Sequence, residues 1–76
     1  MSERKVVDAR DSFCPGPLME LIANIRLIDV GSELELLSKD TGSAEEVPAW
    51  LAKVGHQHIS TEKRGDHWSI VVKRLK

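Results

Sequence analysis

The only cysteine of the sequence, Cys14, carries the side chain best suited to nucleophilic chemistry. Pro15-Gly16-Pro17 follows it directly, and an apolar run with helical spacing begins at once. A helix N-terminus lowers the pKa of a nearby thiol, and only the thiolate is a good nucleophile. The two prolines restrict the backbone, while Gly16 leaves room for the sulfur of a partner to approach. The stretch therefore predicts an accessible thiol on a stiffened turn.

Two familiar kinds of cysteine chemistry lack a second group in this sequence. A cysteine hydrolase needs a base within hydrogen-bond reach, but the histidines lie far along the chain, at positions 56, 58 and 67. A CxxC oxidoreductase needs a second cysteine. His56 and His58 have an i, i+2 spacing that can bind a metal, but no third ligand accompanies them, so we predict neither a metal nor a cofactor. Cys14 is then either a small buried hydrophobe or a nucleophile that accepts a group and hands it on.

Size and charge restrict the class of protein. With 76 residues, 41% hydrophobic and 30% charged, the chain is expected to form one domain over residues 1–76. Its net charge of −1 argues against direct binding of nucleic acid, which usually requires a basic excess. No apolar run has membrane-spanning length, and residues 1–5 do not resemble a signal peptide. We therefore expect a cytoplasmic protein without a membrane partner.

The apolar periodicity predicts two helices and four strands. Residues 5–9 are expected to form a strand, and the spacing from Leu18 to Ile28 indicates an amphipathic helix that ends at Gly31. Residues 33–38 alternate and predict a second strand. After a turn at residues 40–42, the pair Ser43 and Glu46 has the form of a capping box, which favours a second helix closed by Gly55.

Two further strands, residues 56–63 and 68–73, are separated by a turn at residues 64–66. The order βαβαββ predicts an α+β fold: a two-layer α/β sandwich in which both helices cover one face of a mixed four-stranded sheet. Trp50 and Trp68 are expected in the core, and His67 is expected to be exposed. The second sheet face is expected either to be largely solvated or to take part in docking.

Three polar residues are expected around the Cys14 turn: Asp8, Arg10 and Asp40. They either position the turn and contact a partner, or provide ordinary turn hydrogen bonds and surface ion pairs. The residue types alone leave both interpretations open.

Taken together, these features resemble the TusA/SirA/YedF family of small sulfur-carrier proteins. The resemblance covers nearly the whole chain in order, and its core is the CPxP signature. The matching segments are Asp8-Ala9-Arg10, Cys14-Pro15-Gly16-Pro17-Leu18-Met19, Val30-Gly31-Ser32-Glu33-Leu34, Asp40, Glu46-Val47-Pro48-Ala49-Trp50 and Gly55-His56. The family fold is the same βαβαββ sandwich.

The resemblance implies that Cys14 carries sulfur as a persulfide. A donor, such as a cysteine desulfurase or a rhodanese-like protein, would load it, and an acceptor protein of the DsrE/TusD type or another type would take the sulfur over. Such exchange depends on thiolate fraction and access rather than on a bound cofactor. The carrier itself is expected to be a monomer. The family serves tRNA thiolation, cofactor synthesis and sulfur oxidation, and the sequence does not choose among them.

One departure concerns charge near the thiol. Many family members carry Lys or Arg soon after CPxP, whereas residues 20–24 here are Glu-Leu-Ile-Ala-Asn and the first basic residue is Arg26. This departure motivates an alternative function, a non-catalytic binding or regulatory module in which the CPGP stretch shapes a docking loop. A redox sensor that forms an intermolecular disulfide or a sulfenic acid at Cys14 is a third hypothesis.

Overall fold

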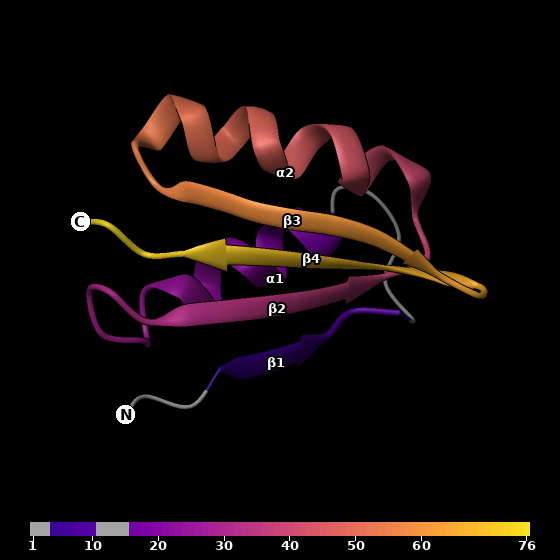
Figure 1. The fold of residues 1–76 in the computed structure, drawn as a ribbon, viewed down its shortest axis with the longest axis horizontal. Helices are drawn as coiled ribbons and strands as arrows, with labels where there is room; N and C mark the ends of the chain where they lie inside the picture. The colour runs from indigo at the N-terminus through magenta and orange to yellow at the C-terminus, as the bar shows by residue number, and fades with distance from the viewer. Residues whose placement is uncertain (1–3, 11–15) are drawn as a thin grey trace.

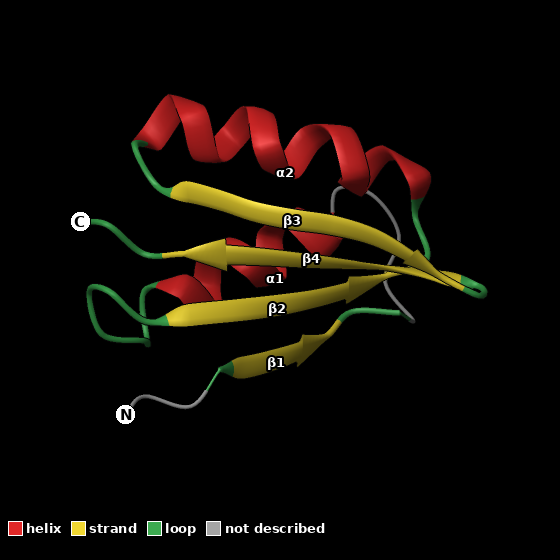
Figure 2. Ribbon diagram, viewed as in Figure 1, coloured by secondary structure: helices red, strands yellow, loops and turns green. Residues whose placement is uncertain are grey.

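The computed structural model describes residues 4–10 and 16–76, and it contains the predicted order of elements (Figures 1 and 2). The α+β fold class is confirmed. The elements are β1 (Lys5–Asp8), α1 (Gly16–Ile25), β2 (Glu33–Ser38), α2 (Thr41–Val54), β3 (Gln57–Arg64) and β4 (His67–Lys73).

The four strands form one mixed sheet in the order β1-β2-β4-β3. β1 runs parallel to β2, and β4 runs antiparallel to both β2 and β3. The parallel pair requires a crossover, which α1 provides, whereas β3 and β4 are joined by a tight hairpin. In Figure 1, α1 lies behind the sheet and α2 runs along its β3 side.

A single cluster of buried side chains joins both helices to one face of the sheet. The strands supply every second residue to it, as the strict alternation of burial along β2 shows. The cluster comprises Val7, Ala9, Leu21, Ile25, Leu34, Leu36, Val47, Leu51, Ile70 and Val72. Trp50 and Trp68 are partly buried and pack against this cluster. Burial of these apolar side chains is what holds the two layers together.

The opposite sheet face is less solvated than its composition suggests. Val6 on the edge strand is 55% exposed, as expected, but Val71 in the centre is only 6% exposed. Glu35 lies directly beside Val71 in the ladder, and its carboxylate accepts a hydrogen bond from the Ser69 hydroxyl. The centre of this face is therefore covered by side chains of its own neighbouring strands.

The helix boundaries differ from the sequence prediction at two places. α1 ends at Ile25 and not at Gly31. Turns follow it, and Gly31, with φ of 93°, donates its N–H to the carbonyl of Arg74. The apolar spacing extended to Ile28 because Ile28 packs on the core from outside the helix.

α2 begins at Thr41, so the predicted turn at residues 40–42 and the predicted cap at Ser43 are both wrong. Asp40 is the N-cap, and its carboxylate accepts the N–H of Gly42 at 3.0 Å. Ser43 is buried and bonds the hydroxyl of Ser38 at 3.0 Å. Gly55 closes the helix with φ of 87°, as predicted.

Candidate functional site

Cys14 and Pro15 lie outside the described residues, as do residues 11–13. The residues on either side of them are described. β1 pairing reaches Ala9, whose N–H donates to the Leu37 carbonyl at 2.8 Å. Gly16 is the first residue of α1, and Pro17 in its first turn is buried. The chain therefore passes from the end of β1 to the start of α1 within residues 10–16.

Several elements begin or end on the side of the molecule where this passage lies. The parallel strands β1 and β2 both finish there, and α1 and α2 both start there (Figure 1). The turn between β3 and β4 reaches the same side, because Trp68 lies beside Ser38 in the sheet. The crevice beyond the carboxyl ends of parallel strands is the usual place for a site in an open α/β sheet.

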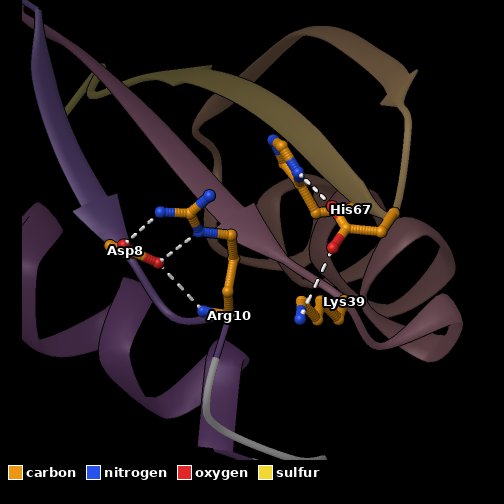
Figure 3. A network of polar contacts seen from close by, with 5 residues as sticks. Asp8, Arg10, Lys39 and His67 are labelled. Carbon is orange, nitrogen blue, oxygen red and sulfur yellow. Dashed lines mark hydrogen bonds and ion pairs between the residues drawn. The ribbon is translucent and has the colours of Figure 1, made fainter.

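Asp8 and Arg10 form a closely paired unit on this side (Figure 3). The carboxylate of Asp8 accepts the backbone N–H of Arg10 at 3.1 Å and its guanidinium at 2.8 and 2.9 Å. The side-chain hydrogen bonds from Arg10, followed by its backbone N–H, lower the pKa of Asp8 to about 2. The pair fixes the backbone as the chain leaves β1.

A second polar group lies beside this pair and was not predicted. Asp66 in the hairpin turn contacts Lys39 at 3.5 Å and the His67 ring at 3.1 Å (Figure 3). The hydrogen bond with His67, and then the charge of Lys39, lower the pKa of Asp66. The His67 side chain is only 18% exposed, so the prediction that it is exposed is wrong. The charge of His67 also contributes to the lowered pKa of Asp8, which links the two groups.

We refer to Asp8, Arg10, Lys39, Asp66 and His67 as the polar cluster. Both of its permanent cations are paired with carboxylates. The contact between Lys39 and Asp66 could not be predicted from the local sequence, because strand pairing brings together two residues that are far apart in the chain. The sequence predicts the turn at residues 64–66, but only the pairing of β4 with β2 places that turn at the end of β2.

Asp40 caps α2, and its predicted place beside the Cys14 turn stays a prediction, because that turn lies outside the described residues. Its carboxylate is engaged at the N-terminus of α2, where it satisfies the N–H of Gly42. It thus helps to fix the start of α2, which lies on the same side as the polar cluster.

The two histidines with metal-like spacing have separate contacts. The Nδ1 atom of His56 accepts the backbone N–H of Leu75 at 3.2 Å, whereas His58 lies 2.6 Å from the Thr61 hydroxyl. A search of residues 4–10 and 16–76 finds no group of three or more His, Cys, Asp or Glu side chains placed to hold a metal.

The described residues define a small α+β domain in which the segment that carries the CPGP stretch joins β1 to α1. Comparison with known families gives a match to the model described as sulfurtransferase TusA, over residues 5–74. The chain belongs to this family of sulfur carrier proteins.

Individual relatives agree with the family. A candidate sulfur carrier protein of Archaeoglobus fulgidus is 51% identical over 71 residues, which are 93% of this chain and 97% of the relative. The candidate sulfur carrier protein TsuB of Escherichia coli K12 is 34% identical over 92% of this chain and 95% of its own length. The sulfur carrier protein TusA of Pseudomonas savastanoi pv. phaseolicola is 26% identical over 75% of this chain and 68% of its own length.

A search of the helices in the described part of the chain finds none that is both long and apolar enough to cross a membrane.

Proposed function

We propose that the chain, acting as one domain over residues 1–76, accepts sulfur as a persulfide on Cys14 and relays it to an acceptor protein. The observation that carries this proposal is the place of the only cysteine in a chain of the TusA family, two residues before the first residue of α1. The N–H groups of that first turn have no partner within the helix, so they favour a nearby anion such as a thiolate or persulfide.

Both transfer steps are simple exchanges at sulfur. The Cys14 thiolate attacks the terminal sulfur of a persulfide on the donor, forms a new S–S bond and releases the donor thiolate. An acceptor thiolate then attacks the outer sulfur of the Cys14 persulfide and regenerates the Cys14 thiolate. Each step transfers one sulfur atom and leaves the total number of thiolates unchanged, so no further oxidant or reductant is needed.

The residues beside Cys14 suit a carrier that meets partner proteins. Met19 in α1 is 58% exposed, and its flexible, polarizable side chain is a suitable contact for a docking surface. The polar cluster adds paired charges on the side of the molecule where α1 starts. We assign the task of positioning the thiol to six residues: Pro15, Gly16, Pro17, Asp8, Arg10 and Asp40. We place the protein in the reducing cytoplasm, because its thiol must stay reduced. We propose that it acts as a monomer.

Persulfide loading is tested by mass spectrometry after incubation with a cysteine desulfurase and cysteine, and in parallel with a rhodanese and thiosulfate. We expect the wild-type protein to gain one sulfur atom and Cys14→Ser to gain none. The matched control combines Cys14→Ser with Ala23→Cys, which moves the single thiol to an exposed position of α1. Equal loading of the relocated thiol would contradict a specific role of Cys14, and no loading of wild type by either donor would favour the docking-loop function.

A further inference from the structure

A cavity of about 260 Å³ lies at the other end of the molecule, where α1 and α2 finish. It is therefore separate from the end at which both helices start and at which the polar cluster lies. Its lining combines apolar and cationic side chains: Ile25, Arg26, Trp50, Val54, His56, Arg74 and Lys76. Among the described residues, no aspartate or glutamate side chain lines it.

Arg74 is held firmly at this cavity. Its Nη1 donates to the carbonyl of Ile28 at 2.6 Å and to that of Arg26 at 3.3 Å, and its Nε donates to a terminal oxygen of Lys76, the last residue, at 2.8 Å. One function of Arg74 is therefore structural, because it satisfies carbonyl groups at and beyond the C-terminus of α1. These bonds also fix the position of its positive charge before any ligand arrives.

The magnitudes indicate that positive charge prevails at the cavity. Two helix C-termini contribute roughly half a negative charge each, or about one in total. Arg26, Arg74 and Lys76 contribute three positive charges, and the terminal carboxylate of Lys76, which accepts from Arg74 Nε, offsets one of them. No ion pair joins any of the three to an aspartate or glutamate side chain in the described part of the chain, so the balance is about one positive charge. Burial is the main cause of the lowered pKa of His56, and the nearby charges of Arg74 and Lys76 lower it further.

His56 offers a hydrogen-bond donor rather than another charge. Its Nδ1 accepts the backbone N–H of Leu75, so the neutral ring carries its proton on Nε2. The Trp50 ring lies 5.9 Å from the His56 ring and tilted by 47°. With Ile25 and Val54, Trp50 gives the cavity an apolar wall beneath its cationic rim.

We propose that this cavity binds a carboxylate carried on a compact apolar group. The wall would hold the apolar group, and Arg26, Arg74 and Lys76 would pair with the carboxylate. A volume below the usual range of roughly 300–1,000 Å³ for ligand pockets limits the group to about the size of one aromatic ring. Such a carboxylate can belong to a free metabolite or to an apolar C-terminal residue of another protein. The proposal does not depend on sulfur transfer.

Binding is tested with sodium benzoate as the probe and neutral benzamide as its isosteric control. We expect benzoate to shift the NMR signals of the Trp50 indole N–H and the His56 ring, and to bind about tenfold or more tightly than benzamide, as the loss of charge-assisted contacts predicts. Equal affinity for the two probes, or no shift with benzoate, would overturn the proposal.

Charge-reversal variants test the residues. Arg26 is exposed, so Arg26→Glu should leave the fold intact and weaken benzoate binding about tenfold or more. Lys53→Glu makes the same charge change on an exposed residue of α2 outside the lining and should leave the affinity unchanged. If both variants lower the affinity for benzoate equally, the binding depends only on long-range electrostatic attraction, and the proposed site is refuted.

The source of the carboxylate is distinguished by one further arm. A short peptide that ends in phenylalanine is titrated with a free and with an amidated C-terminus. Tighter binding of the free peptide than of benzoate assigns the cavity to a partner protein, and weaker binding assigns it to a free small molecule. Both outcomes support the site, and both leave the persulfide experiment to decide the proposed function independently.

Discussion

At the scale of single residues, the ion pair of Asp8 with Arg10 holds the backbone just before the segment that leads to Cys14. Two residues separated by one position share three hydrogen bonds, so their geometry is set almost locally. The pair is exposed, and exposed pairs contribute little to stability. Its effect is to hold the chain direction at the end of β1.

The Asp8 carboxyl should titrate with a midpoint near 2, measured by NMR as a function of pH. Arg10→Ala should raise this midpoint toward 3.8 without reaching it, because the backbone N–H of residue 10 still donates. Because the pKa of Asp8 is lower in the folded state than in the unfolded state, the ionised carboxylate stabilises the fold. This small contribution is present above pH 3.8 and is lost as the pH falls toward 2.

Arg64→Ala is the control for this titration, since it removes an exposed pair with Glu62 within β3. It should leave the midpoint of Asp8 in place. If Arg10→Ala also leaves it in place, Arg10 is not the cause of the lowered pKa.

At the scale of elements, the N-cap of α2 was predicted wrongly from the sequence. Ser43 and Glu46 have the spacing of a capping box, yet Asp40 provides the cap. Two acceptable caps lay within three positions, and burial decided between them. Ser43 faces inward, where its hydroxyl meets that of Ser38, so it is unable to serve as the half-exposed first residue of a helix.

Asp40→Ala should lower the free energy of unfolding by about 1 kcal/mol, because the N–H of Gly42 loses its acceptor. Urea denaturation followed by circular dichroism measures this change. Asp40→Asn should retain most of the stability, and Glu45→Ala on the exposed side of α2 should change it little. A loss for Glu45→Ala as large as that for Asp40→Ala would remove the case for a specific cap.

At the scale of the whole molecule, the two faces of the sheet differ in what covers them. Both helices pack on the face that carries Leu34, Leu36, Ile70 and Val72. The other face has no helix among the described residues and is covered only in part, by side chains such as Glu35. Adjacent residues of one strand therefore lie in different surroundings.

Leu36 and Leu37 provide a matched test of this difference. Leu36 is fully buried under the helices, and Leu36→Ala should cost about 2–5 kcal/mol of unfolding free energy. Leu37 is partly exposed on the other face, so Leu37→Ala removes the same atoms at a smaller cost. Chemical denaturation of the two variants side by side gives the comparison, and equal losses would mean that the second face is as well packed as the first.

The sequence by itself determined the features that depend on neighbours along the chain. β2 was predicted with its observed bounds because alternation of side chains is a local property of a strand. Gly55 was predicted as the end of α2 because a left-handed residue there favours glycine. The βαβαββ order and the two-layer fold followed from these local patterns.

Only the tertiary structure decided which distant residues meet. Pairing of β4 with β2 brings Asp66 and His67 beside Lys39 and buries most of His67. Arg74 reaches the carbonyl of Arg26 across 48 positions and closes the cavity between the helix ends. The physical reason is that each contact depends on the relative placement of two elements, which burial of the shared core fixes and the spacing within either element leaves open.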